Sequence, residues 1–303
     1  MDETAKAMVL ASFAADSLAL GPHWIYDQKR IESLFGRVDR LLQPGSGSQH
    51  RGKRAGEQTH YGDQALILLD SLASRHTFDL SDFASRWQRL FADYPGYIDQ
   101  ATRGTLQGFG RGEPPERAGS RSTDLAGASR IAPLVCLYRS ETEQAVQAAR
   151  AQTQMTHATG EVVDAAEFFA RTGMSVLAGE QPIQAMERAA EIAYAALPAG
   201  EWLDKGMRLA GEATGPAVQS LGLSCHIDEA FPATVQIITR FQDDLRQALI
   251  ECVMAGGDSA ARGMLIGMVL GASIGLQGVP DEWLDNLRAR SRIEDRLQSI
   301  LAG

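Results

Sequence analysis

The chain has 303 residues, of which 44% are hydrophobic and 22% are charged, so it is long and apolar enough to form a compact core. Its formal charge of -9 and its lack of a concentrated basic stretch argue against a nucleic-acid-binding surface, because neutralising phosphates requires clustered cations. The cysteines lie far apart without Cys-x-x-Cys spacing, and the N-terminus lacks the pattern of a secretory signal; we therefore expect free thiols and a cytoplasmic location.

The first predicted helix is the alanine-rich stretch over residues 4–20, which Gly21-Pro22 ends. Asp16 lies near its C-terminal end, where the helix dipole disfavours a carboxylate, so Asp16 either sits on an exposed edge or has a partner or a role. The aromatic cluster that follows, residues 23–26, either lines a pocket or wedges helices apart. A short helix is then predicted from Asp27 to Phe35.

Residues 43–58 form the most obvious loop, rich in Gly and Ser and carrying three cations. It is either a plain solvated loop or a lid that attracts phosphate. A core-facing helix is predicted after it, over residues 65–74, with Asp63 at its start. His60 either enters the same site as Asp63 or is only a loop residue, and Glu57 is either a general base or a solvated side chain.

The middle of the chain shows helical periodicity with short connections and no long strand alternation. We therefore expect an all-α fold and a single domain over residues 1–303. Helices are predicted over residues 83–94, 98–109, 123–138, 141–152, 162–177 and 181–197, with two more between residues 227 and 253.

The turn Gly256-Gly257-Asp258 is the clearest structural signal. A Gly pair does not suit a helix interior, whereas Asp258 can cap a helix, so we expect a turn that delivers a carboxylate to a helix beginning at Ser259. This helix is shorter than the roughly 20 apolar residues that cross a bilayer, which predicts a buried core helix and no membrane contact. One of its faces should admit a close neighbour, because a glycine recurs there every fourth residue, at Gly263, Gly267, Gly271 and Gly275.

Five motifs, in this order, resemble the ADP-ribosylglycohydrolase superfamily, which includes ADP-ribosylarginine and ADP-ribosylserine hydrolases, dinitrogenase reductase-activating glycohydrolases and J1 crystallins. The motifs are AADSLALGPHW, HYGDQALILLDSL, SRIAPL, MTH and AGGDSAARGMLIGMVLGASIG, and they cover nearly the whole chain. The resemblance implies an all-α protein with two Mg²⁺ or Mn²⁺ ions in a central cleft. It also implies hydrolysis of the bond that joins ADP-ribose to an arginine or a serine.

The chain departs from the family pattern at both acidic motifs. Thr-Asp-Asp-Thr is replaced by Tyr61-Gly62-Asp63-Gln64, and Gly-Gly-Asp-Thr-Asp-Thr by residues 256–261, so each motif keeps one aspartate. Two close divalent ions need several carboxylates, so we expect one ion or none, with Asp63, Asp258 and Ser259 as the candidate ligands. Arg262 lies four residues after Asp258, and it either pairs with that carboxylate in place of a missing metal or points to solvent or a helix carbonyl.

The resemblance implies a hydrolase that cleaves a glycosidic bond to ADP-ribose, in an ADP-ribosylated side chain or a small conjugate. The alternative is a non-catalytic protein, either an ADP-ribose-binding or nucleotide-binding module or a structural protein like the J1 crystallins. Aromatic side chains such as Tyr61 either stack on adenine or belong to the core, and His157 either caps a helix or approaches the substrate. The candidate catalytic residues are Asp63, Asp258 and Glu57, and the candidate substrate-binding residues are Asp16, His60, Tyr61, Ser122, His157 and Arg262.

Overall fold

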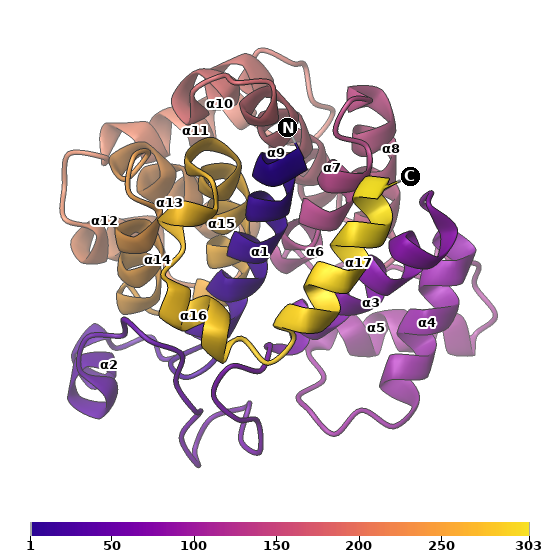
Figure 1. Ribbon diagram of the computed structural model, residues 1–303, viewed down its shortest axis with the longest axis horizontal. Helices are drawn as coiled ribbons and strands as arrows, with labels where there is room; N and C mark the ends of the chain where they lie inside the picture. Colours follow the sequence, from indigo (N-terminus) through magenta and orange to yellow (C-terminus); the bar gives the residue numbers. More distant parts are fainter. Residues whose placement is uncertain (1, 303) are drawn as a thin grey trace.

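A computed structural model describes residues 2–302, and it is built of helices packed around two central ones (Figure 1). Within this range no strand forms, and the β-type pairings are isolated bridges, so the all-α prediction is confirmed. The end residues of the domain predicted over 1–303 lie outside the described residues. The helices are α1 (Asp2–Ala19), α2 (Gln28–Phe35), α3 (His60–Arg75), α4 (Leu80–Ala92), α5 (Gln100–Gly110), α6 (Ala126–Ser129), α7 (Ala132–Leu137), α8 (Thr142–Gln154), α9 (Gly160–Leu177), α10 (Pro182–Ala190), α11 (Ala199–Arg208), α12 (Thr214–Leu221), α13 (Ile227–Arg240), α14 (Leu245–Met254), α15 (Ser259–Ile274), the 3₁₀ turn η1 (Leu276–Gly278), α16 (Asp281–Asn286) and α17 (Arg290–Ala302).

Helices α1 and α15 pack directly against each other at the centre of the molecule (Figure 1). The glycines of α15 face α1: a Cβ at Gly267 would lie 2.6 Å from the carbonyl oxygen of Ala11, and one at Gly263 would lie 3.5 Å from the Cβ of Ala15. Because the contacts run in opposite directions along the two helices, the end of α1 and the start of α15 lie at the same end of the pair. The chain segments that adjoin these two ends are thereby brought together.

Helix α15 is buried along most of its length, as the sequence predicts. No helix within residues 2–302 is long and apolar enough to cross a membrane. The prediction was wrong for Gly275, which is not part of the helical face: it ends α15 with a φ of +86°, a conformation that glycine adopts readily.

The Gly-Gly turn before α15 is bonded to the segment that follows α1. Gly256 and Gly257 have φ values of +81° and +68°, and a Cβ at Gly257 would overlap the carbonyl oxygen of Leu223. The Trp24 N–H donates to the Gly257 carbonyl at 3.0 Å, and the Gly257 N–H donates to the Ile25 carbonyl at 2.9 Å. Only glycine fits this close turn, which fixes residues 23–26 against the start of α15.

Most predicted helices form, with shifted ends. Helix α3 begins at His60, five residues earlier than predicted, because the Thr59 hydroxyl accepts the Tyr61 N–H and caps the helix. His60 is therefore a helical residue and not a loop residue. The stretch 123–138 is divided into α6 and α7, and the helix predicted over 181–197 ends at Ala190. The helices α11, α12, α16 and α17 were not predicted.

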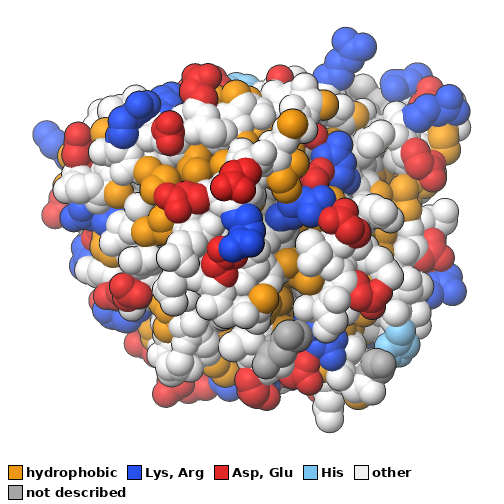
Figure 2. Space-filling view, turned by 90° about the horizontal axis from the view of Figure 1, so that it is seen from above, with side chains coloured by type: hydrophobic (Ala, Val, Ile, Leu, Met, Phe, Trp, Pro, Cys, Tyr) orange, Lys and Arg blue, Asp and Glu red, His pale blue; other side chains and the backbone are white. Residues whose placement is uncertain are grey.

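One hydrophobic cluster of buried side chains runs from Ala5 in α1 to Ile300 in α17. Helix α17 contributes Ile293, Leu297 and Ile300 to it, so the C-terminal helix is part of the core. On the face shown in Figure 2, acidic and basic side chains are interspersed, with apolar patches between them. This mixture fits the moderately acidic composition of the chain.

We predict that Gly267→Ala lowers the free energy of unfolding by about 1–3 kcal/mol, because the new Cβ would press on the backbone of α1. Denaturant-induced unfolding measures the change. The matched controls are Gly263→Ala, whose Cβ would make an ordinary contact at 3.5 Å, and Gly200→Ala in α11, whose Cβ would have no neighbour within 4 Å. Equal stability of all three variants would contradict the close packing described for α1 and α15.

Candidate functional site

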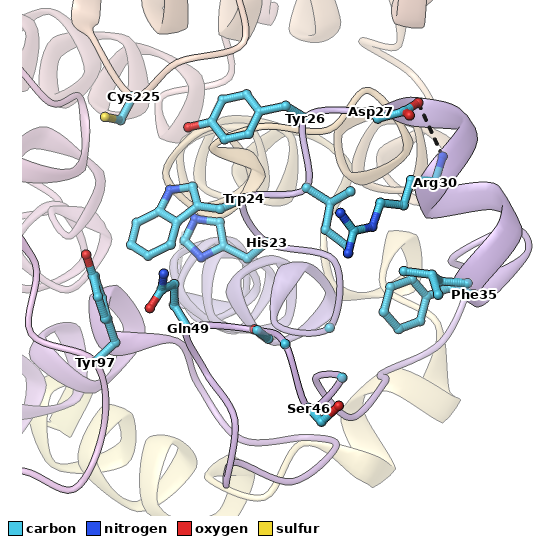
Figure 3. A pocket seen from close by; sticks show the side chains of 16 residues that line it. His23, Trp24, Tyr26, Asp27, Arg30, Phe35, Ser46, Gln49, Tyr97 and Cys225 are labelled. Carbon is cyan, nitrogen blue, oxygen red and sulfur yellow. Dashed lines mark hydrogen bonds between the residues drawn. The ribbon is translucent and has the colours of Figure 1, made fainter.

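A cavity of about 940 Å³ opens between the segment after α1, helix α2, the Gly/Ser-rich loop and Tyr97 (Figure 3). In Figure 3, Trp24, Tyr97 and Gln49 lie on one side of this cavity, while Arg30 and Phe35 reach into it from α2 on the other. We call it the first cavity. Its lining residues are Gly21, His23, Trp24, Ile25, Tyr26, Asp27, Arg30, Leu34, Phe35, Gly45, Ser46, Gly47, Ser48, Gln49, Tyr97 and Cys225.

Asp258 lies behind the wall of the first cavity and is fully buried. Its Oδ1 atom is 2.8 Å from Nε2 of His23, and Nδ1 of His23 is 2.9 Å from Nε2 of His50. Burial lowers the pKa of His23, which outweighs the opposing effect of the hydrogen bond to Asp258, and burial likewise lowers the pKa of His50. Both histidines are therefore neutral at pH 7.

These contacts assign the tautomers along the chain once Asp258 is taken as the acceptor. When Asp258 accepts the Nε2–H of His23, Nδ1 of a neutral His23 carries a lone pair and accepts the Nε2–H of His50. Nδ1 of His50 then also carries a lone pair, and it is buried without a hydrogen-bond partner within residues 2–302. With these tautomers, the last atom of the hydrogen-bonded series, Nδ1 of His50, can accept a proton. We call these three residues the Asp258–His23–His50 chain.

A second carboxylate–histidine pair lies beside this chain. Nε2 of His60 is 2.9 Å from Oδ2 of Asp99, and Nδ1 of His60 has no partner among the described residues. Burial acts to raise the pKa of Asp99, but the hydrogen bond from His60 and its Coulombic interaction bring that pKa below its usual value. The rings of His60 and His50 are 5.3 Å apart, so the two pairs form one histidine cluster.

Trp24 covers the histidine cluster. Its ring stacks on His23 with centroids 4.4 Å apart and on His50 with centroids 5.6 Å apart, and it also meets Tyr97 edge-on. Its φ of +66° is unusual for a residue other than glycine, and such strained conformations concentrate at functional sites. Trp24 thus stacks over His23 and His50 at the wall of the first cavity, which His23 itself also lines.

Asp16 is fully buried, so the exposed alternative is wrong. Its carboxylate accepts the N–H of Thr59 at 2.7 Å and the hydroxyl of Thr59 at 2.5 Å. Burial raises the pKa of Asp16 to about 6, although the bonds from Thr59 act in the opposite direction. A Cβ at Gly62 would overlap Oδ2 of Asp16, so the carboxylate of Asp16 lies where the family's missing aspartate would project.

Asp63 lines a different cavity, of about 740 Å³, which we call the second cavity. Its carboxylate is 2.5 Å from Nζ of Lys53 and also accepts the hydroxyl of Tyr94. Glu57 lines the same cavity and accepts the backbone N–H of Arg54 at 2.9 Å. Asp63 and Asp258 were expected to share one cleft, but Asp63 lines the second cavity, whereas Asp258 lines neither cavity and is bonded to His23.

Arg262 is buried and donates to the carbonyl oxygen of Gly256. Among residues 2–302 it forms no ion pair with Asp258, so the predicted pairing is wrong, and the helix-carbonyl alternative is the one that the structure contains. Asp258 occupies the cap position of α15, but its side chain makes no capping hydrogen bond because it points toward His23. Oδ2 of Asp258, Oγ of Ser259, and Nε and Nη1 of Arg262 remain buried without partners in the described chain.

Two candidates remain, His157 and Ser122, and Arg130 of the SRIAPL motif is linked to His157 through Thr156. Arg130 donates to Thr156 at 2.5 Å and to Gln64 at 2.9 Å, and its burial lowers its pKa to about 10. His157 is hydrogen-bonded to Thr156 and does not cap α9, whose cap position is Thr159; burial lowers the pKa of His157 to about 3. Ser122 accepts the N–H of Asp124 at 3.2 Å and lines neither cavity.

The carboxylates do not fit the two-ion site that the family resemblance implies. Asp63 is bonded to Lys53, Asp16 to Thr59 and Asp258 to His23, so each already has donors or a cation from the chain. No group of three or more His, Cys, Asp or Glu side chains within residues 2–302 is arranged to hold a metal ion. A single ion at Oδ2 of Asp258 and Oγ of Ser259, which lack hydrogen-bond partners within residues 2–302, stays a prediction.

His60 and Tyr61 lie beside His23, the partner of Asp258: their ring centroids are 6.3 Å and 5.5 Å from that of His23. The sequence did not indicate His23 as the partner of Asp258, nor the roles of His50, Asp99, Lys53 and Tyr97. His23 and Trp24 stood in the cluster that was expected either to line a pocket or to wedge helices apart. His23 could have been paired with Asp258 only if it had been known that the end of α1 lies beside the start of α15.

The ADP-ribosylglycohydrolase family model matches residues 1–303. An uncharacterized protein of Archaeoglobus fulgidus is 25% identical over 97% of this chain and 95% of its own length. Crystallin J1A of Tripedalia cystophora is 24% identical over 93% of this chain and 91% of its own length. A solved structure titled "ADP-ribosylglycohydrolase-related protein complex" superposes with a TM-score of 0.76 at 21% identity, covering 99% of this chain and 98% of that chain, which shows the same fold.

We predict that Asp16 makes the folded protein less stable as the pH rises from about 4 to about 6. The pKa of its carboxyl rises from the ordinary value of 3.8 to about 6 on folding, so the folded form binds the proton more tightly, and its contribution to stability is lost as the pH rises through that window. The stability difference between the parent and Asp16→Asn should change by up to roughly 3 kcal/mol across these pH values. Urea unfolding at several pH values measures it, and a pH-independent difference would contradict the raised pKa.

Proposed function

Because this chain belongs to the ADP-ribosylglycohydrolase family, a glycohydrolase superfamily, we propose that it hydrolyses the glycosidic bond of an ADP-ribosyl conjugate. The observation that carries this proposal is the Asp258–His23–His50 chain at the wall of the first cavity. Hydrolysis at an anomeric carbon needs a group that accepts a proton from the attacking water, and this hydrogen-bonded chain ends in such an acceptor.

The first cavity has the chemistry to hold an ADP-ribosyl group. At about 940 Å³ it lies in the range of small-molecule sites, which are lined by aromatic groups and a few polar ones. Trp24, Tyr26 and Tyr97 offer rings against which adenine can stack, and Arg30 offers a guanidinium suited to a diphosphate. The ribose would then lie toward His23 and Gln49.

Hydrolysis requires that Trp24 or the loop before His50 be displaced, so that water reaches the histidine. The water oxygen bonds to the anomeric carbon while the bond to the arginine nitrogen or serine oxygen breaks, and the leaving group takes a proton from solvent. The water's proton passes to Nδ1 of His50, the Nε2 proton of His50 passes to His23, and the Nε2 proton of His23 passes to Asp258. Both histidines end neutral, in their other tautomers, and Asp258 ends protonated.

Mg²⁺ or Mn²⁺ has no part in this step. The family's two ions would polarise the ribose. In this chain, however, the carboxylate of Asp63 forms an ion pair with Lys53, and Oδ1 of Asp258 is hydrogen-bonded to His23. One ion bound through Asp258 and Ser259 is a separate proposal, which a metal titration of the chelator-treated protein would test.

The second candidate function is a non-catalytic one, which the similarity to the J1 crystallins supports. Burial of the whole Asp258–His23–His50 chain favours it, because a working site must expose its proton acceptor to water. Under this alternative the protein binds ADP-ribose without hydrolysing its conjugates, or does not bind it.

We predict that Asp258→Asn lowers the rate of ADP-ribose release from peptides carrying ADP-ribosylated arginine or serine by about 10²–10⁴-fold. Asparagine can still accept the His23 N–H but cannot take up the relayed proton. Chromatography of released ADP-ribose measures the rate.

The control for this prediction is Asp70→Asn, which removes a surface carboxylate paired with Arg292 and Arg296 and should leave the rate unchanged. Asp63→Asn tests the other candidate carboxylate in the same assay. Full activity of Asp258→Asn would refute the catalytic role of the Asp258–His23–His50 chain. A parent protein that binds ADP-ribose but releases none from the peptides would establish the non-catalytic alternative.

A further inference from the structure

The second cavity, which Asp63 lines, shares no lining residue with the first cavity and is built from four segments. These are the loop 51–58, the first half of α3, the end of α4 with residues 94–96, and the start of α17. Its volume of about 740 Å³ is sufficient for a small organic ligand. Its lining residues are Arg51, Gly52, Lys53, Arg54, Glu57, Gln58, Asp63, Leu66, Ile67, Leu90, Tyr94, Pro95, Gly96, Arg288, Ala289 and Arg292.

Cations dominate the charged part of this lining. Lys53 forms an ion pair with Asp63, and Arg292 forms one with Asp70, which Arg296 shares. Arg51, Arg54 and Arg288, by contrast, form no ion pair with any residue of the described chain 2–302, and the one remaining carboxylate of the cavity is Glu57. In a protein with a formal charge of -9, unpaired guanidinium groups gathered around one hollow make a local positive site.

Much of the rest of the lining is apolar. Leu66 and Ile67 of α3, Leu90 of α4, and Ala289 contribute aliphatic surface, and Tyr94 adds a ring held in place by its hydrogen bond to Asp63. A free inorganic ion would leave this surface exposed to water. A ligand that has both an anionic group and an apolar or aromatic body would cover both parts.

We propose that the second cavity binds a small organic phosphate of nucleoside-monophosphate size, with its phosphate toward Arg51, Arg54 and Arg288 and its base against Leu66, Ile67 and Tyr94. Guanidinium groups suit this ligand because their planar donor pairs match phosphate oxygens. The site is separate from the first cavity and does not depend on the proposed hydrolase activity.

Calorimetric titration of the full chain with AMP tests this proposal. AMP binds the parent, adenosine binds at least about tenfold more weakly, and raising the salt concentration weakens AMP binding. The double variant Arg51→Gln/Arg54→Gln weakens AMP binding by at least about tenfold, since each charged hydrogen bond contributes to affinity. Both side chains lack hydrogen bonds to residues 2–302, so this variant keeps the fold.

Two further variants locate the binding site. Arg296→Gln, on α17 but outside the lining, is the matched control and leaves AMP affinity unchanged. Arg30→Gln removes the guanidinium of the first cavity only, and it also leaves AMP affinity at the second cavity unchanged. The proposal is overturned if AMP does not bind or if adenosine binds equally well. It is also overturned if Arg30→Gln weakens AMP binding while the double variant does not. None of these outcomes bears on whether the parent hydrolyses ADP-ribosyl peptides.

Discussion

The close contact between α1 and α15 determines where the candidate site can form. Gly267 and Gly271 have no side chains to hold α1 away, so the two helices lie antiparallel with backbone near backbone. The segment leaving α1 and the turn entering α15 therefore meet at one end, where the Gly256-Gly257 turn bonds to Trp24 and Ile25. His23 and Asp258, 235 positions apart in the sequence, come within 2.8 Å for this reason.

Partners from the chain itself, a lysine at Asp63 and a neutral histidine at Asp258, distinguish this protein from the two-ion pattern that the resemblance implies. Lys53 comes from the Gly/Ser-rich loop to Asp63, and His50 comes from the same loop to His23. This loop was expected either to be a plain solvated loop or to be a lid; it lines both cavities and supplies a buried side chain to the histidine cluster. Each acidic motif has lost one aspartate, and the aspartate that remains has a partner from the chain: Lys53 beside Asp63 and His23 beside Asp258.

The sequence was sufficient to predict the helical class, the family resemblance and the start of α15 at Ser259, all of which are confirmed. These features depend on local periodicity and on glycine and aspartate at fixed spacing. Partners could not be predicted in the same way: Asp258 suggested a helix cap, but its side chain bonds to His23, and Arg262 bonds to a carbonyl instead of to Asp258. Such choices depend on which distant side chains the packing brings close, and local pattern does not contain that information.

We infer, as the centre of the proposed function, that the histidines of the Asp258–His23–His50 chain and Arg30 of the first cavity replace the ions in binding and orienting the ADP-ribosyl group. Calorimetric titration of the chelator-treated protein with ADP-ribose, before and after adding Mg²⁺ or Mn²⁺, tests this inference. Arg30→Gln identifies the first cavity as the site, because that substitution weakens the binding. We expect binding in the presence of chelator, with an affinity that added metal leaves unchanged. Binding that appears only after metal is added, or no binding at all, would contradict the inference.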